Sequence, residues 1–167
     1  MRSAPGRATR PTSDRVREAV FSMLETPGKR VLDLFAGSGA LGIEALSRGA
    51  GYAVFVERDG RAAEAIAANL AALGLGPPHA RLLRRGAADA LEAAANGGDT
   101  YDLVFIDPPY REAEAWAARL PTLLPPVLAS GARLVAEFGR GGELELPGEE
   151  QRRRRYGDTT VKINQIQ

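Results

Sequence analysis

The sequence has 167 residues, of which 44% are hydrophobic and 26% are charged, and it contains no cysteine. These proportions are typical of one globular domain with a buried core, and the lack of cysteine excludes disulfide scaffolds, thiolate metal sites and cysteine nucleophiles. The apolar runs are shorter than the roughly 20 residues of a membrane-spanning helix, and no apolar segment follows the N-terminal arginines as in a signal peptide. We therefore expect a soluble, cytoplasmic protein.

The formal net charge is only +1, but the basic residues are unevenly composed and placed. Lys29 and Lys162 are the only lysines among the 22 basic residues, so nearly all of these are arginines. A GC-rich genome is one explanation. The arginines also concentrate in residues 2–17 and in the unbroken run at residues 152–155. Because guanidinium groups pair bidentately with phosphates, basic ends on a nearly neutral body favour contacts with nucleic acid.

The first segment of the chain is polar, basic and interrupted by proline and glycine. This composition predicts an N-terminal arm at residues 1–12, followed by a single domain at residues 13–167. Within that domain, apolar residues three and four positions apart predict a first amphipathic helix, which ends before Pro27.

Short apolar strands then alternate with alanine-rich helical stretches, which predicts a parallel sheet with helices on both faces. The predicted strands are residues 31–35, 53–57, 81–84, 103–106 and 133–138, and the predicted helices between them are residues 40–47, 61–73, 88–95 and 112–120. Two last strands, 152–156 and 159–166, flank a Gly-Asp turn and predict an antiparallel hairpin. The predicted fold class is α/β, with a Rossmann-like, mostly parallel twisted sheet.

A glycine-rich loop follows the first predicted strand. Residues 37–42 match the dinucleotide fingerprint G-x-G-x-x-G, and Glu57 ends the second strand, where it can accept hydrogen bonds from ribose hydroxyls. This spacing is compatible with a nicotinamide cofactor. Asp33 favours S-adenosylmethionine instead, because a carboxylate four residues before Gly37 would repel a pyrophosphate but attract ammonium and sulfonium groups. Without a ligand, the loop is a tight turn and Asp33 is a solvated or helix-capping acid.

A second candidate site follows the fourth predicted strand, where Asp107, Pro108, Pro109 and Tyr110 form a loop. In an open parallel sheet, ligands bind at the carboxyl ends of the strands near the switch in strand order, so we expect this loop beside the glycine loop. The Asp107 carboxylate and the Pro108 carbonyl can accept the hydrogens of an aromatic amino group and make its nitrogen more nucleophilic. The prolines fix φ, and Tyr110 can stack on the ring. The alternative is a proline turn beside a core aromatic residue.

Together these motifs resemble class I methyltransferases that act on exocyclic amino groups of nucleic-acid bases, which share an Asp/Asn-Pro-Pro-aromatic loop. The blocks at residues 10–18, 32–42, 44–50 and 107–110 are similar, more closely, to the bacterial guanine-N2 methyltransferases of 16S ribosomal RNA. This resemblance implies S-adenosylmethionine as cofactor, with S-adenosylhomocysteine as product and no metal. It also implies a monomeric enzyme whose substrate is small-subunit ribosomal RNA in a ribosomal particle.

The resemblance further assigns roles to individual residues. It implies a catalytic loop of Asp107, Pro108, Pro109 and Tyr110. It implies a cofactor site of Thr12, Asp33, Phe35, Ala36, Gly37, Ser38, Gly39, Glu57, Arg58 and Ala87. The substrate would contact Arg10, Arg15, Arg17 and Tyr110. The chain departs from this pattern in two places, since only ten residues precede Pro11 and the acid that meets the adenine in relatives is displaced to Asp89.

Three other functions stay open at this point: an amino-methyltransferase of DNA adenine or cytosine, a nicotinamide-dependent oxidoreductase and an RNA-binding module without catalytic activity. The sequence has no recognisable DNA-recognition domain, which favours RNA over DNA. The arginine run at 152–155 is typical of a solvated edge strand, because like charges discourage pairing between sheets, with RNA contact as the alternative. We expect His79 in a solvated loop and Trp116 in the core or partly buried.

Overall fold

The computed structural model describes residues 14–167, and its strands form one mixed sheet in the order β3-β2-β1-β4-β5-β7-β6. The strands β1 to β5 run parallel to their neighbours in this group, whereas β7 is antiparallel to both β5 and β6. The predicted fold class, including its C-terminal hairpin, is therefore confirmed. The strands are β1 (Arg30–Asp33), β2 (Tyr52–Val56), β3 (Ala80–Leu83), β4 (Tyr101–Ile106), β5 (Leu128–Phe138), β6 (Glu149–Tyr156) and β7 (Thr159–Gln165).

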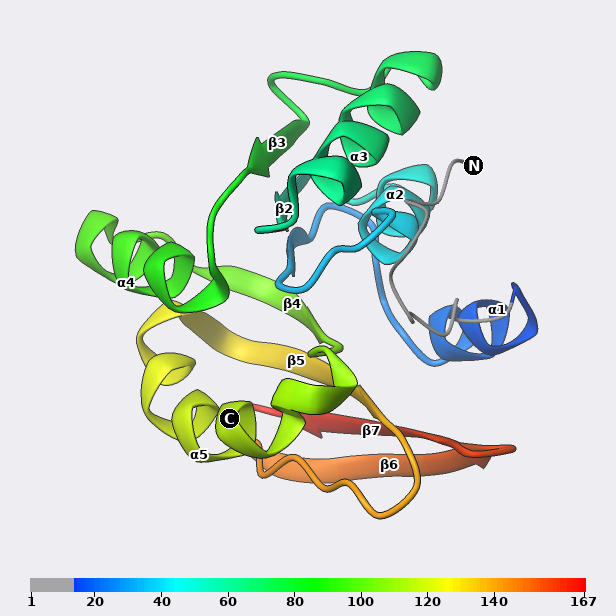
Figure 1. Ribbon diagram of the computed structural model, residues 1–167, viewed down its shortest axis with the longest axis vertical. Coiled ribbons are helices and arrows are strands. Elements are labelled where there is room, and N and C mark those ends of the chain that lie inside the picture. The colour runs from blue at the N-terminus through cyan, green and yellow to red at the C-terminus, as the bar shows by residue number, and fades with distance from the viewer. Residues whose placement is uncertain (1–13) are drawn as a thin grey trace.

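Helices cover both faces of the sheet, with α1, α2 and α3 on one side and α4 and α5 on the other (Figure 1). Each face of the sheet has its own hydrophobic core, and alternate strand residues contribute to one or the other. Val31 and Phe105 pack toward α1 to α3, and Leu32 and Val104 pack toward α4 and α5. The helices are α1 (Asp14–Ser22), α2 (Ala40–Ser47), α3 (Gly60–Ala72), α4 (Ala87–Gly97) and α5 (Ala113–Leu123), with the short 3-10 turns η1 (Tyr110–Glu112) and η2 (Pro125–Val127).

Two strands begin three or more residues earlier than predicted. β5 begins at Leu128 rather than at residue 133, because Leu128 pairs with Tyr101 of β4 and a bulge separates this pair from the Leu103–Arg133 pair. β6 begins at Glu149 rather than at residue 152, because β7 continues to Gln165 and supplies pairing partners. Both extensions depend on a neighbouring strand, so the local pattern of apolar residues could not predict them.

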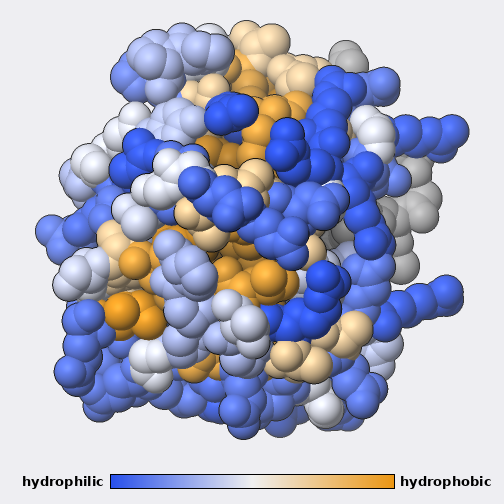
Figure 2. Space-filling model, turned by 90° about the vertical axis from the view of Figure 1, so that its left-hand side faces the viewer, coloured by the Kyte–Doolittle hydropathy of each residue, from blue (hydrophilic) through white to orange (hydrophobic). Residues whose placement is uncertain are grey.

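The surface of the described residues is largely free of large apolar side chains. The exposed ones in residues 14–167 are Leu73, at 57% exposure, and Tyr110, at 81%. On the side of α4, apolar residues show in separate patches between hydrophilic ones (Figure 2). His79 is exposed in its loop, as predicted. No helix in the described part of the chain is both long and apolar enough to cross a bilayer. The exposed Tyr110 ring is an unusual feature of a surface that covers nearly all large apolar side chains of the described residues.

The strand order reverses beside β1, which pairs with β2 on one side and with β4 on the other. The carboxyl ends of β1 and β4 lie side by side, since the amide of Leu34, directly after β1, donates to the carbonyl of Phe105 in β4 at 3.1 Å. This reversal is the predicted switch point. It brings the glycine loop and the Asp-Pro-Pro-Tyr loop to the same edge of the sheet.

Candidate active site

The glycine loop joins β1 to α2 and needs glycine at three places. Gly37 and Gly39 have φ of +58° and +81°, in the left-handed region that glycine adopts without strain. Gly42 lies in the first turn of α2, where a Cβ would approach Cε1 of Phe55 to 2.3 Å. The third glycine of the fingerprint is thus explained by close packing of α2 on β2 rather than by a ligand.

Neighbouring elements hold the backbone of this loop in place. The Ala36 amide donates to the Val56 carbonyl at 2.9 Å, at the end of β2. The Ser38 carbonyl accepts a 3.1 Å hydrogen bond from the side-chain amide of Asn69, which is buried in α3. Sequence reasoning missed Asn69, although a polar residue on the buried face of an alanine-rich helix was a usable signal. The loop is therefore preformed in the folded chain.

Asp33 is buried, with 3% of its surface exposed, at the end of β1. Its Oδ2 atom accepts a hydrogen bond of 3.0 Å from the Gly42 amide in the first turn of α2. Burial raises the pKa of Asp33 from 3.8 to about 7, the Gly42 bond opposes this shift, and the nearby Glu57 carboxylate adds to it. The structure thus supports the helix-capping interpretation and also leaves a carboxylate whose charge a nearby cation would stabilise.

Glu57 follows β2 and is also buried, at 3% exposure. Its Oε2 atom accepts from the Gly37 amide at 2.8 Å, and its Oε1 atom accepts from the Asp59 amide at 3.0 Å. The Glu57 carboxylate therefore joins the glycine loop to the segment after β2.

A narrow cleft opens between the two loops. One wall is apolar, because the rings of Phe35 and Trp116 meet edge to face with centroids 5.1 Å apart. Several predicted cofactor residues line the cleft, and Pro109 of the second loop lines it too. The full lining is Leu34, Phe35, Val56, Glu57, Arg58, Arg85, Ala87, Pro109, Glu112 and Trp116.

Five residues of this cleft were missing from the predicted site: Leu34, Val56, Arg85, Glu112 and Trp116. Trp116 is buried, as expected for a core residue, and it also forms part of the wall. Glu112 accepts hydrogen bonds from the Arg58 guanidinium and, at 3.2 Å, from Nε1 of Trp116. Glu112 and Trp116 are four residues apart, a spacing that places them on one side of a helix and could have indicated the pair. Through Glu112 the segment after the second loop is tied to the segment after β2.

The second loop is more open than the first. Pro108 is buried and Asp107 is half-buried, and the Pro109 carbonyl accepts from the Glu112 amide at 2.8 Å to start η1. The Tyr110 side chain is 81% exposed. Its ring passes beside Gly139, since a Cβ added to Gly139 would lie 3.9 Å from Cε2 of Tyr110. The alternative that this aromatic residue belongs to the core is therefore wrong. The ring is accessible at the edge where the two loops meet.

The remaining predicted residues lie apart from this cleft or outside the described residues. Thr12 and Arg10 fall outside residues 14–167. Arg15 is exposed on α1, whereas Arg17 forms ion pairs of 2.7 Å and 3.7 Å with carboxylates of α1 and α2. Asp89 is exposed in the first turn of α4. In the described part of the chain, no three His, Asp or Glu side chains are grouped to hold a metal ion.

Sequence comparisons relate almost the whole chain to known proteins. A family model described as "Conserved hypothetical protein 95" matches residues 1–165. The chain is 44% identical over 151 residues to "Putative rRNA methyltransferase YlbH" of Bacillus subtilis, covering 88% of this chain and 79% of that protein. It is 43% identical over 104 residues to "Ribosomal RNA small subunit methyltransferase D" of Escherichia coli K12, covering 61% of this chain and 50% of that protein. The match therefore spans about half the length of the latter relative.

Solved structures show the same arrangement of elements. "Putative methyltransferase yhhF" of Escherichia coli superposes with a TM-score of 0.80 at 33% identity, covering 98% of this chain and 90% of that chain. An RNA methyltransferase from Salinibacter ruber, solved in complex with S-adenosyl-L-homocysteine, superposes with a TM-score of 0.69 at 16% identity, covering 93% of each chain. The second likeness shows the shared fold alone.

Proposed function

This chain belongs to the family described as "Conserved hypothetical protein 95", and on that premise we propose that it is an S-adenosylmethionine-dependent methyltransferase acting on the exocyclic N2 amino group of a guanine in small-subunit ribosomal RNA. One observation carries the proposal: a glycine loop flanked by the buried carboxylates of Asp33 and Glu57 meets an open Asp-Pro-Pro-Tyr loop at the carboxyl ends of β1 and β4. We also propose that the enzyme acts as a monomer on a ribosomal particle in the cytoplasm.

The residues of the first loop fit the proposed cofactor, which supplies an activated methyl group on a cationic sulfonium when it is bound. The Asp33 carboxylate would attract the cationic amino-acid end. The Glu57 carboxylate, which accepts from the Gly37 and Asp59 amides, would also accept hydrogen bonds from the ribose hydroxyls. The Phe35 and Trp116 rings would contact the adenine, with Arg58 and the backbone of Ala87 at its rim.

The second loop would hold the target base. The guanine has to leave its stack to reach the loop, and the exposed Tyr110 ring would then stack on its face. The Asp107 carboxylate and the Pro108 carbonyl would accept the two amino hydrogens and turn the nitrogen lone pair toward the methyl group. Asp107 would also accept the proton that the amino group releases. The contribution of these residues is orientation of the two reactants in a site shielded from water.

Residues of the N-terminal segment complete the proposal. We propose that Thr12 contacts the methionine end of the cofactor and that Arg10 and Arg15 contact RNA phosphates. Arg17 would contribute less, because two carboxylates already balance its charge.

Isotope transfer tests the proposal directly. The protein is incubated with a methyl-labelled donor and with small ribosomal subunits from a strain that lacks this family member, and the modified nucleotide is mapped. We expect label in N2-methylguanine of the ribosomal RNA. Label in adenine or cytosine of a DNA control would assign the activity to DNA instead. Tight binding of NAD in a calorimeter, with no binding of S-adenosylhomocysteine, would replace methyl transfer by a nicotinamide-dependent reaction.

A further inference from the structure

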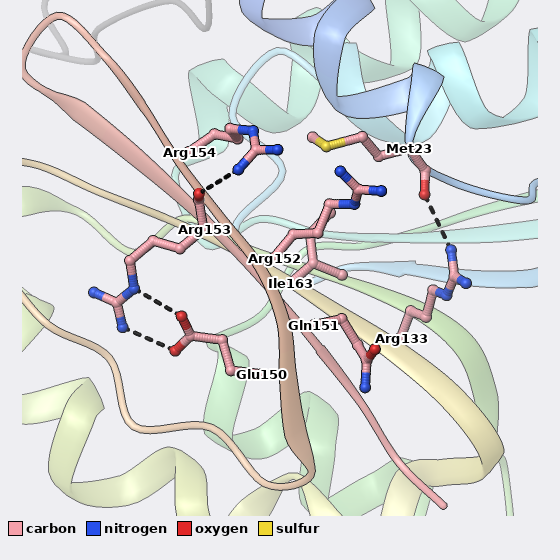
Figure 3. A pocket seen from close by; sticks show the side chains of 8 residues that line it. All are labelled: Met23, Arg133, Glu150, Gln151, Arg152, Arg153, Arg154 and Ile163. Carbon is pink, nitrogen blue, oxygen red and sulfur yellow. Dashed lines mark hydrogen bonds and ion pairs between the residues drawn. The ribbon is translucent and has the colours of Figure 1, made fainter.

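The arginine run of β6 is divided between the two faces of the sheet, because successive side chains of a strand point to opposite sides. Arg152 pairs with Ile163 of β7, and Arg154 pairs with Val161. Ile163 and Val161 are buried in the core that faces α1, so these two arginines share the α1 side. In Figure 3 both guanidinium groups point toward Met23, whereas Arg153 points to the other side of the strand.

On that other side the charges are balanced. The Arg153 guanidinium donates to both carboxylate oxygens of Glu150, at 2.9 Å each, and to those of Glu143, at 2.7 Å and 3.1 Å. The buried Lys162 ammonium lies 3.5 Å from Glu143 and 3.6 Å from Glu150. Hydrogen bonds from Arg153 hold the pKa of both carboxyl groups below its usual range. Two cations and two anions therefore form a closed group, which needs no outside partner.

On the α1 side of β6, three arginines have no carboxylate partner among residues 14–167. Arg133, Arg152 and Arg154 line an open hollow of about 460 Å³ between β6 and the end of α1 (Figure 3). The Arg133 guanidinium donates to the Met23 carbonyl at 3.0 Å, and that of Arg154 donates to the Arg153 carbonyl at 3.2 Å. Within residues 14–167 none of these three arginines has an ion pair.

One carboxylate borders this hollow, but it does not neutralise the arginines. Glu150 is among the lining residues, and both of its oxygens are bound by Arg153. Figure 3 shows its side chain turned toward Arg153. We call Arg133, Arg152 and Arg154 the basic track.

The basic track begins near the edge of the sheet that carries Tyr110. β6 runs in the same direction as β5, because β7 is antiparallel to both. Arg155 and Phe138 both pair with Thr160, so the end of β6 lies level with the end of β5, where Gly139 passes beside the Tyr110 ring. From that end the track runs back through Arg154 and Arg152 to Arg133. A strand whose base enters the proposed site could thus continue along it.

We propose that the basic track binds successive phosphates of the ribosomal RNA next to the target guanine. This inference rests on the proposed function for its substrate. Arg152 and Arg154 are two residues apart on one strand, which separates their Cα atoms by about 6.6 Å, close to the spacing of neighbouring phosphates in an extended strand. Guanidinium groups bind phosphate oxygens bidentately, and the hollow offers them without a competing carboxylate. RNA is favoured over a protein partner because this lining is cationic and no large apolar side chain in it is exposed.

The test compares the double variant Arg152→Gln/Arg154→Gln with the wild type and with a matched control, Arg61→Gln/Arg81→Gln. The control removes the same charge from exposed residues of α3 and β3, and β3 is the opposite edge of the sheet. Binding to protein-free 16S RNA and to small ribosomal subunits is measured over a range of salt concentrations, together with methyl transfer. Affinity for S-adenosylhomocysteine reports whether each variant is folded.

We expect the plot of log K against log salt to become shallower by about 1.5 in the track variant, since each lost phosphate contact removes about 0.7 to 0.9 from the slope. KM for RNA should rise while kcat and cofactor affinity stay unchanged, and the control should keep more of the wild-type slope than the track variant does. Equal slopes for the track variant and the control would overturn the proposal. A loss seen on subunits but not on protein-free RNA would also overturn it, in favour of a ribosomal protein. If the wild type binds RNA through the track but transfers no methyl group, the proposed function fails and the track stands.

Discussion

The two loops of the candidate site differ in how the chain supports them. The glycine loop is held from several sides: β2 binds the Ala36 amide, Asn69 binds the Ser38 carbonyl and Glu57 binds the Gly37 amide. The Asp-Pro-Pro-Tyr loop has a half-buried carboxylate and ends in Tyr110, which is 81% exposed. One loop is part of the core, and the other lies at its surface.

This difference corresponds to the size of the two proposed reactants. A small cofactor can be enclosed by one chain, so its site can be built from buried backbone groups and carboxylates. A base of a large RNA has to arrive from outside, so its site has to stay open until the RNA covers it. We therefore expect changes at the glycine loop to affect stability together with cofactor binding, and changes at the second loop to affect activity toward RNA without affecting stability.

The largest effect should follow from Asp107→Asn. The amide keeps the shape of the side chain but cannot act as a charged acceptor for the amino hydrogens, so we expect kcat to fall by roughly 10²- to 10³-fold. Affinity for S-adenosylhomocysteine and the free energy of unfolding should stay near the wild-type values. Asp158→Asn, in the exposed turn between β6 and β7, is the control and should keep full activity. Methylation by the Asp107 variant within a few-fold of wild type would contradict the assigned role.

A smaller effect, now on stability, should follow from Gly42→Ala. The new Cβ would lie 2.3 Å from Cε1 of Phe55, so α2 and β2 have to move apart. We expect the free energy of unfolding in urea to fall by about 1–3 kcal/mol, the usual cost of overpacking. Gly60→Ala is the matched control, because a Cβ there meets nothing within 4 Å at the start of α3. The double variant Gly42→Ala/Phe55→Leu should recover part of the loss, and equal stability of the two single variants would refute the packing argument.

Tyr110→Ala tests the second loop, where we expect a loss of activity without a loss of stability. Stacking on one base contributes about 1–3 kcal/mol, so we expect kcat/KM for RNA to fall by about one to two orders of magnitude. Tyr110→Phe keeps the ring and should keep most of the activity. Because the side chain is 81% exposed, neither variant should change the urea midpoint by much. If both variants lost activity equally, the hydroxyl rather than the ring face would be the important group.

The sequence predicted what depends on local pattern and on strand order. Alternating strands and helices indicated the sheet, and the predicted switch in strand order between β1 and β4 placed the two loops together. Asp33 and Glu57 were found because each ends a buried strand next to the glycines. These are features that a few neighbouring residues determine.

Contacts between distant elements could not be predicted in this way. Glu112 binds Arg58 across 54 residues, and Asn69 binds the Ser38 carbonyl across 31 residues, which depends on how α5 and α3 pack. The division of the arginine run also depended on pairing, because a bulge at Gln151 decides which arginines face α1. In the sequence the four arginines are equivalent charges, whereas pairing with β7 separates Arg153, which two carboxylates balance, from Arg152 and Arg154, which have no ion pair within residues 14–167.

The smallest predicted effect concerns pH and tests the buried loop through Asp33. Its pKa is raised from 3.8 to about 7, chiefly by burial, so near neutral pH the carboxyl group is only partly charged in the free protein. If the charged form attracts the cationic end of the cofactor, affinity for S-adenosylhomocysteine should fall by about an order of magnitude as the pH drops from 7.5 to 6. Calorimetric titration at several pH values measures this. In Asp33→Asn, affinity should be weak and should lose this dependence.

The same group predicts a pH dependence of stability with the opposite sense. A raised pKa means that the folded chain prefers neutral Asp33, so this stabilising contribution is complete at low pH and is lost as the pH rises from 3.8 to about 7, while the unfolded chain ionises first. Urea unfolding between pH 5 and pH 8 should therefore show the wild type losing stability relative to Asp33→Asn, whose side-chain oxygen can still accept from the Gly42 amide. Parallel curves would mean that Asp33 ionises as easily in the fold as in water. Opposite trends in binding and in stability would show that one buried carboxylate destabilises the fold in the charged form that holds the cofactor.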